Sequence, residues 1–216
     1  ILWNQGWKLD LNLFLAKAVE AWRELFPAFA VDTAQLTSDL SALLRQRITS
    51  QLEDDGYAAD LVQAVAGGTV PTKRLLRDPL DVRVRIQLLR GLRDQGRLTA
   101  VQAVVQRASR LAEKGDLPLD VLSSTEVVDP SRFESASEKG LFDATKRLNP
   151  LAESGAYQEL CDVLVESTPA LEAFFDGDES VMVMADDSAL RMNRLNLLGV
   201  LRNQAAVFAQ FELIQS

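Results

Sequence analysis

Residues 187–211 read DSALRMNRLNLLGVLRNQAAVFAQF and indicate what kind of structure this chain forms. The apolar side chains recur every three or four residues, so at about 100° per residue they share one arc of a helix. The residues of this arc are Leu190, Leu197, Leu198, Leu201, Ala205 and Phe208. The segment is therefore predicted to be a long amphipathic α-helix that packs against a core.

Arg194 lies in the middle of this apolar arc, and Arg191 and Arg202 border it. A guanidinium in an apolar surface must be paired or must reach solvent, because burying an isolated charge is very costly. One interpretation makes Arg194 a buried clamp on a carboxylate or on helix-end carbonyls. The other places Arg191, Arg194 and Arg202 along a groove that holds a nucleotide.

The same helical spacing recurs along almost the whole chain. Helices are predicted near 9–26, 33–55, 58–66, 78–95, 99–112, 132–148, 155–166 and 169–175. Asp78-Pro79 and Asp129-Pro130 each place a capping residue before a proline, and Thr99 is a further expected cap. Only Val181–Met184 alternates with period two. We therefore expect an all-α protein built from helical bundles.

The segment 115–130 interrupts the pattern with glycine, proline and serine, which is typical of a linker or a domain boundary. Two helical regions are expected, one over 1–128 and the other over 129–216.

The composition excludes several kinds of catalytic site. The 216 residues include no histidine and one cysteine, Cys161, which removes Ser-His-Asp and Cys-His nucleophiles, histidine metal sites and a structural zinc cluster. A chain with a single thiol cannot form an intramolecular disulfide, which is typical of a protein in a reducing compartment. No apolar run reaches the roughly 18 residues that a membrane-spanning helix requires. A cytoplasmic protein with no membrane contact is expected. The chain begins at Ile1 within an apolar stretch, so we expect a fragment of a longer polypeptide.

Charge is distributed unevenly along the chain. The net charge is -8, yet residues 73–110 carry ten basic side chains against three acids, and residues 130–216 carry 7 basic and 14 acidic side chains. Because exposed charges more than about 10 Å apart are largely screened, the middle segment can attract a polyanion although the whole chain is acidic.

Two rows of cations within and just beyond this segment are candidate phosphate contacts. Arg83 and Arg90 are seven residues apart on one helix face, and Arg107, Arg110 and Lys114 lie opposite the apolar side of the next helix. The alternative is a set of ordinary surface side chains balanced by neighbouring acids.

Two other patterns have simpler explanations than a ligand site. Gly91–Leu98 has the glycine spacing of a phosphate loop, but lacks its lysine and hydroxyl, and a helix end closed by Gly96 accounts for the glycines. The acidic clusters at 176–179 and 186–187 lack the spacing of an EF-hand, and helix capping is the expected role of such residues.

Several short motifs identify a resemblance that covers essentially the whole chain. The most specific ones are Phe174-Phe175-Asp176, Val181-Met182-Val183-Met184-Ala185-Asp186-Asp187, Ala189-Leu190-Arg191, Asn193-Arg194-Leu195 and Leu197-Leu198. Earlier ones are Arg45-Gln46-Arg47, Asp54-Asp55-Gly56-Tyr57, Asp78-Pro79-Leu80-Asp81, Asp129-Pro130-Ser131-Arg132-Phe133, Gly155-Ala156-Tyr157 and Pro169-Ala170-Leu171. Together they resemble the C-terminal part of the bacterial glycyl-tRNA synthetase β subunit. The loop Gly177–Ser180 is longer than usual for that family, and the family's histidine-dependent HD-type domain must lie outside this chain.

The resemblance implies an α2β2 class II ligase that uses ATP to attach glycine to its tRNA. It implies that adenylation, with ATP and Mg²⁺, belongs to the α subunit, and that the β subunit binds tRNA(Gly) through a C-terminal DALR-type anticodon-binding helical domain. This chain itself is expected to be non-catalytic and to hold no cofactor or metal. The expected RNA-binding residues are Arg83, Arg90, Arg107, Arg110, Lys114, Arg191, Asn193, Arg194 and Arg202.

A second hypothesis, which assigns the chain to a different functional class, also remains open. The chain would then be a helical interaction module for assembly of the α and β subunits, without direct RNA contact. An independent enzyme has no support, because no nucleophile system or nucleotide loop is present.

Overall fold

Aspartate and serine side chains start several of the helices. In the computed structural model, which describes residues 2–215, Asp10, Asp32 and Asp187 each accept hydrogen bonds from backbone N–H groups of a following first turn. Ser135 and Glu138 form a reciprocal capping box at a fourth helix. These caps satisfy N–H groups that have no partner within the helix.

The described residues form ten α-helices and no β-strand, so the predicted all-α class is confirmed. The helices are α1 (Leu2–Gln5), α2 (Leu11–Leu25), α3 (Thr33–Asp54), α4 (Ala59–Ala66), α5 (Thr72–Arg77), α6 (Pro79–Asp94), α7 (Leu98–Ala112), α8 (Ala136–Ser154), α9 (Tyr157–Phe175) and α10 (Ser188–Phe208). Short 3₁₀ turns lie at Ser124–Glu126, Pro130–Arg132 and Phe211–Leu213.

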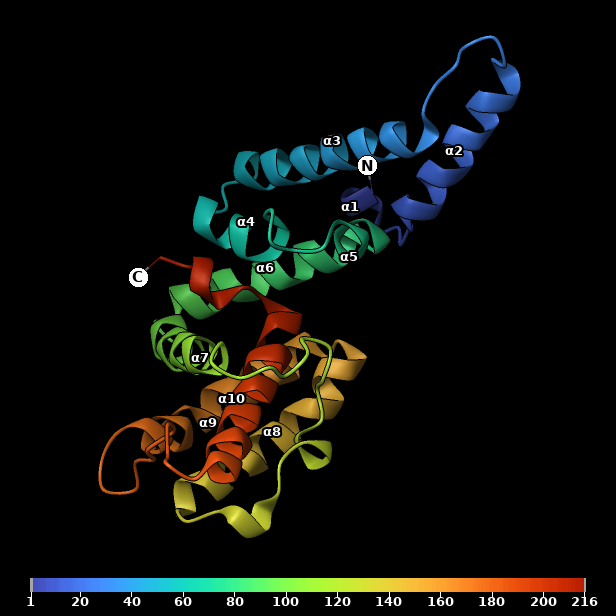
Figure 1. Ribbon diagram of the computed structural model, residues 1–216. Coiled ribbons are helices and arrows are strands. Elements are labelled where there is room, and N and C mark those ends of the chain that lie inside the picture. The colour runs from blue at the N-terminus through green and yellow to red at the C-terminus, as the bar shows by residue number, and fades with distance from the viewer. Residues whose placement is uncertain (1, 216) are drawn as a thin grey trace. The chain divides into compact units, whose positions relative to one another are not determined.

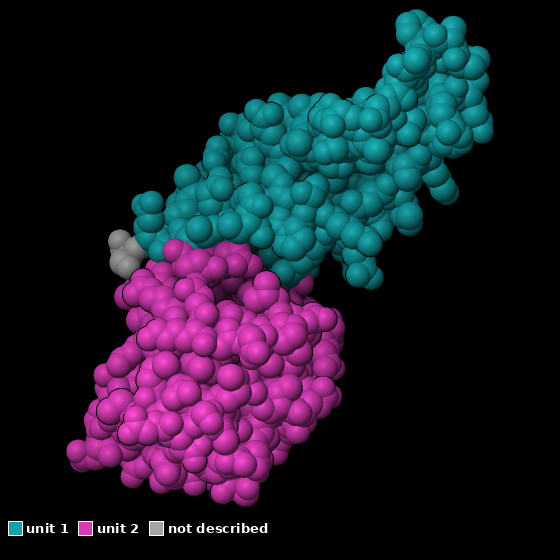
Figure 2. Space-filling view, in the orientation of Figure 1, with its two compact units in different colours: residues 1–90, 213–215 teal, residues 91–212, 216 magenta. Residues whose placement is uncertain are grey.

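The chain divides into two compact units (Figure 2). Unit 1 comprises residues up to Arg90 together with Leu213–Gln215, and unit 2 comprises Gly91–Glu212. The division between these compact units falls within α6, and the predicted boundary between residues 128 and 129 lies inside unit 2. The segment 115–130 is part of unit 2 because side chains of α10 hold it there.

Amide side chains of α10 bind the segment that was expected to be a linker. Asn203 donates to the carbonyls of Pro118 and Val121 over 2.8 and 2.9 Å. Gln204 donates to the carbonyls of Leu122 and Thr145 over 2.7 and 2.8 Å. Both side chains are buried, so these bonds satisfy backbone groups inside the core.

Unit 2 is a bundle in which α10 packs against α7 and α8, and α9 packs against α7 and α8 (Figure 1). Leu197, Leu198 and Leu201 of α10 are fully buried, as the apolar arc predicted. In unit 1, α3 packs against α2, α4 and α5.

Several sequence predictions about local structure are wrong. Arg97, not Thr99, precedes α7, and its side chain makes no capping bond. Asp129-Pro130 starts a 3₁₀ turn rather than a long helix, because the capping box at Ser135 starts α8 later. The helices predicted on both sides of Pro169 are one helix, since Leu171 and Phe174 beyond the proline are buried and keep it in place.

Candidate nucleic-acid interface and the residues that position it

Arg194 is a buried clamp. Its Nε donates to Glu138 over 2.8 Å and its two terminal nitrogens reach Glu134 and the carbonyl of Met182 over 2.8 and 3.1 Å. The side chain is 4% exposed and that of Glu138 is 0% exposed. The sequence left two interpretations of Arg194 open, and the structure agrees with the one in which its guanidinium is buried and binds a carboxylate.

The charges around Arg194 keep it ionised in spite of burial. Burial disfavours the charged guanidinium, but hydrogen bonds and charges from Glu138 and Glu134 outweigh this effect and raise the pKa of Arg194 above its ordinary value. The pair links α10 to α8, and the bond to Met182 links both to the loop before α10.

Asn193 forms a second clamp beside the first. Its side-chain amide donates to the carbonyl of Asp129 over 3.1 Å, and its oxygen accepts from the N–H of Asp129 over 2.7 Å. Asn193 and Arg194 therefore hold the two ends of the segment Asp129–Glu134 against α10.

The four residues of α10 that were expected to contact RNA all make hydrogen bonds within the protein. Asn193 and Arg194 are buried and committed to protein groups, so their role is to position the segment Asp129–Glu134. Arg202 is half-buried and donates to the carbonyl of Leu117 over 3.1 Å, and burial lowers its pKa. Arg191 is half-buried and donates to the carbonyl of Ala185 over 2.8 Å.

The cations of α7 lie on the surface of unit 2. Arg107 pairs with Asp176 over 2.6 Å and stacks on Phe175, with its guanidinium carbon 4.6 Å from the ring centroid. Arg110 and Lys114 are exposed, and within residues 2–215 neither forms an ion pair with a carboxylate. Arg110 on α7 and Lys114, two residues beyond the end of that helix, are therefore available to an external anion.

The cations predicted on α6 belong to unit 1. Arg83 is half-buried, with its guanidinium 5.8 Å from the ring of Trp3, and Arg90 lies 5.6 Å from the ring of Tyr57. Arg85, also counted in the basic segment, is buried and pairs with Asp81 over 2.8 Å. The two rows of cations thus lie in different units. In each unit, some of the basic side chains already interact with carboxylates or aromatic rings of the protein.

Sequence reasoning missed a hollow in unit 2 beside the clamped segment. Its volume is about 480 Å³, within the usual range of small-molecule sites. Pro130, Phe133, Ala136 and Phe142 supply its apolar lining, and the charged side chains of Lys139 and Asp143 also line it. A signal was present in the sequence, since Lys139, Asp143 and Lys146 are spaced to share one face of a helix.

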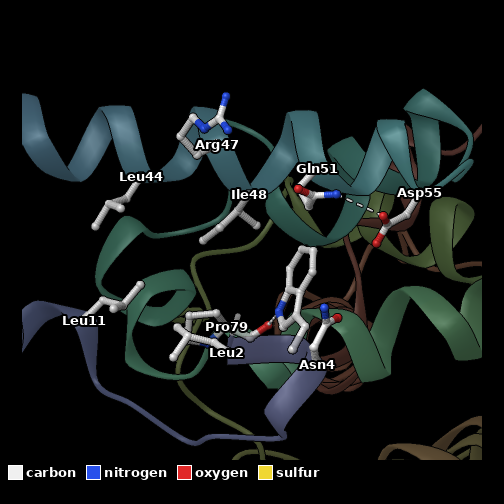
Figure 3. A pocket seen from close by; sticks show the side chains of 10 residues that line it. Leu2, Asn4, Leu11, Leu44, Arg47, Ile48, Gln51, Asp55 and Pro79 are labelled. Carbon is white, nitrogen blue, oxygen red and sulfur yellow. Dashed lines mark hydrogen bonds between the residues drawn. The ribbon is translucent and has the colours of Figure 1, made fainter.

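A second hollow, of about 410 Å³, lies in unit 1 between α1, α2 and α3. Figure 3 shows Leu11, Leu44 and Ile48 along it, with the guanidinium of Arg47 pointing away from Pro79. Gln51 at its edge donates to Asp55 over 3.0 Å. Its polar groups do not converge on one point, so this hollow has no evident ligand.

Unit 1 also exposes a large apolar surface. The helix α2 buries Leu15 and Val19, but Phe14, Leu25 and Phe29 are 57%, 73% and 64% exposed. We call Phe14, Leu25 and Phe29 the α2 apolar surface. Exposed apolar side chains that form a contiguous patch are typical of a site that contacts another macromolecule.

The acidic clusters considered as metal sites have other roles. Asp176 pairs with Arg107, and Asp187 caps α10. Glu179 accepts hydrogen bonds from Ser135 at the start of α8. Among the described residues, no group of three or more histidine, cysteine, aspartate or glutamate side chains is arranged to hold a metal ion. Over the same residues, no helix has the length and hydropathy of a membrane span.

Comparison with known proteins relates the chain to the subunits of tRNA ligases. No protein-family model matches it. The glycine–tRNA ligase beta subunits of Picosynechococcus sp. and Acaryochloris marina are each 40% identical to it over 99% of its length, and that of Aliivibrio salmonicida is 31% identical over 100%. The chain is therefore related over its whole length to part of the glycine–tRNA ligase beta subunit, as its motifs indicated. It spans about 30% of the length of these relatives.

Proposed function

We propose that this chain is a tRNA-binding part of a glycine–tRNA ligase β subunit and that it supports the attachment of glycine to tRNA(Gly). The observation that carries this proposal is the similarity of the whole chain to glycine–tRNA ligase beta subunits. Residues 129–216, most of which lie in unit 2, are proposed to form a DALR-type domain that meets the anticodon region. The proposed location of the protein is the cytoplasm.

The chemistry of ligation is proposed to occur elsewhere in the enzyme. ATP and Mg²⁺ act at the α subunit of an α2β2 assembly, and this chain contributes binding energy for the RNA without a catalytic residue. Its candidate phosphate contacts in unit 2 are Arg110 and Lys114, which are exposed and have no carboxylate partner in the described part of the chain. Cations of this kind gain free energy at a nucleic acid by releasing its condensed counterions.

The test is a titration of fluorescently labelled tRNA(Gly) with the full chain at two salt concentrations. The double variant R110E/K114E is expected to bind more weakly than the unmodified chain and to show a shallower salt dependence. Each lost phosphate contact lowers the slope of log affinity against log salt by about 0.7–0.9. A tRNA for another amino acid, titrated in parallel, measures specificity.

The matched control is K8E/K17E, which makes the same change of charge on exposed lysines of unit 1. If R110E/K114E and K8E/K17E have the same affinity and the same slope as the unmodified chain, Arg110 and Lys114 do not contact tRNA. If the unmodified chain does not bind tRNA(Gly), the proposed function is wrong.

The α2 apolar surface favours a second candidate function, which is assembly with the α subunit without RNA contact. Replacing Leu25 and Phe29 with serine removes exposed apolar area while leaving Leu15 and Val19 in the core. In this second case L25S/F29S weakens association with the α subunit, measured by analytical ultracentrifugation, and R110E/K114E has no effect on tRNA affinity.

A further inference from the structure

Two aromatic rings form the floor of the hollow in unit 2. The ring centroids of Phe133 and Phe142 are 5.6 Å apart and the rings meet edge to face. Phe142 is 8% exposed, whereas Phe133 is half-buried and reaches the surface. A ring in this position can stack on a flat ligand, because an aromatic side chain on a rigid support presents its face at little entropic cost.

The segment that carries Phe133 is held at both ends. Asn193 binds the backbone of Asp129 through two hydrogen bonds, and Arg194 binds Glu134. The hydroxyl of Ser135, one residue further, donates to the carbonyl of Glu179 over 2.9 Å. The floor of the hollow is therefore organised before any ligand binds.

Two of the three charged side chains that line the hollow are free of ion pairs within residues 2–215, and the third, Glu134, pairs with Arg194. Lys139 and Asp143 line it, both are exposed, and neither is within ion-pair distance of an opposite charge. The amino group of Lys146, one helical turn further, lies 5.6 Å from the ring centroid of Phe142. The hollow thus combines an aromatic floor, the carboxylate of Glu134 that Arg194 already engages, the unpaired carboxylate of Asp143, and the ammonium groups of Lys139 and Lys146.

The start of α8 itself is not an anion site. Glu138 accepts from the N–H groups of Glu134 and Ser135, and Glu179 accepts from Ser135 and Ala136. Any phosphate near the hollow must therefore be bound by the lysines.

We propose that this hollow binds one unstacked base of a single-stranded RNA segment, and that it favours bases with an exocyclic amino group. The base stacks on Phe133, Asp143 accepts a hydrogen bond from the amino group, and Lys139 and Lys146 contact the neighbouring phosphates. Single-stranded RNA is read in this way, by stacking and by hydrogen bonds to base edges. The inference rests on the proposed function and gives it a particular binding site.

The experiment uses the full chain and short RNA homopolymers as probes. Affinities for octamers of cytidine, adenosine and uridine are measured by fluorescence anisotropy at low salt. Cytosine and adenine carry an amino group and uracil does not, so the cytidine and adenosine octamers are expected to bind more tightly than the uridine octamer.

Two substitutions separate stacking from base preference. Phe133→Leu keeps an apolar side chain against Phe142 but removes the ring, so all three octamers should bind about fivefold more weakly or worse. Phe133→Tyr should restore binding. Asp143→Asn replaces a pure acceptor with a group that also donates, so the affinity ratio of the cytidine octamer to the uridine octamer should fall close to one.

Matched variants control for general effects. Phe26→Leu removes an exposed phenylalanine from unit 1, and Asp120→Asn removes an exposed carboxylate from a loop of unit 2. Both should leave the affinities for the octamers unchanged. Circular dichroism of each variant confirms that the helices are retained.

The site is disproved if Phe133→Leu and Asp143→Asn are folded and bind the octamers as the unmodified chain does. If R110E/K114E still weakens tRNA(Gly) binding in that case, the proposed function stands without this site. If the unmodified chain binds neither the octamers nor tRNA(Gly), both proposals are wrong.

Discussion

Arg194 of α10 donates from Nε to Oε1 of Glu138 on α8 over 2.8 Å, and the two side chains are 4% and 0% exposed. The residues are 56 positions apart in the sequence. Because Arg194 also binds Glu134 and the carbonyl of Met182, one side chain links two helices and the loop before α10. An arginine within a family motif thus supports the tertiary structure.

Removing the guanidinium should destabilise the chain strongly. Arg194→Met leaves the carboxylate of Glu138 buried without its partner, and the expected loss in the free energy of unfolding is about 3–5 kcal/mol. Urea denaturation followed by circular dichroism measures it. The double variant R194M/E138M should cost less than the sum of the two single variants, since no buried charge is left unpaired. A single variant as stable as the unmodified chain would contradict the clamp.

Gly199 and Gly140 should respond differently to alanine, although both lie within helices. At Gly199 an added Cβ would lie 2.8 Å from Cδ2 and 3.3 Å from Cβ of Leu117, whereas at Gly140 the nearest atom, Cβ of Ala170, is 3.7 Å away. Gly140→Ala should therefore stabilise the protein by about 0.5–1 kcal/mol through helix propensity. Gly199→Ala should destabilise it by about 1–2 kcal/mol because the crowding outweighs that gain. Thermal unfolding of both variants tests the contrast, and equal stabilisation would show that the segment at Leu117 gives way freely.

The cap of α10 should make stability depend on pH in the acid range. The N–H groups of Leu190 and Ala189 donate to Asp187 and lower the pKa of its carboxyl below the ordinary value of 3.8. The ionised carboxylate therefore stabilises the folded state at pH values above 3.8, and this contribution is lost as the pH falls through the lowered pKa.

Asp187→Asn tests this linkage, because asparagine also caps a helix but does not titrate. Urea unfolding measured at several pH values below 5 should show a smaller decline in stability for Asp187→Asn than for the unmodified chain. Parallel declines would assign the acid sensitivity to other carboxylates, such as Asp129, whose pKa is lowered by hydrogen bonds from Ser131.

Cys161 should be unreactive in the folded protein. Burial, together with the negative charge of Asp162, raises the pKa of the Cys161 thiol to about 12. At pH 8 about one thiol in 10,000 is then ionised, and the thiolate is the reactive form. Titration with a chromogenic disulfide should give no rapid reaction in buffer and one thiol per chain in guanidinium chloride. Rapid reaction of the folded chain would show that α9 opens readily.

The helices of this protein could be located from the sequence because their signals are local. The apolar arc of 187–211 corresponds to α10, and the capping residues Asp78 and Asp187 act as expected, with Asp78 accepting from the N–H of Leu80 over 3.0 Å. Each of these signals involves residues within one or two turns of each other. The helices α1 and α5 were not predicted, because a helix of only four or six residues is too short to show a clear apolar periodicity.

The candidate site was predicted less well, because a cation looks the same in the sequence whether or not it has a partner. Arg107 and Arg110 are three positions apart, yet the first pairs with Asp176 and the second stays unpaired among the described residues. Asn193 and Arg194 were expected at an RNA surface and are buried clamps.

The sequence alone determined the all-α class, the helical periodicity and the family resemblance, since these depend on side-chain spacing along the chain. Only the tertiary structure decided which charges are used inside the protein and which remain on its surface. The physical reason is that an ion pair, and the packing that fixes a surface segment in place, depend on distances between residues far apart in the sequence. Glu138 and Arg194 became partners, and the segment that carries Phe133 was fixed at both ends, only when α8 and α10 packed together.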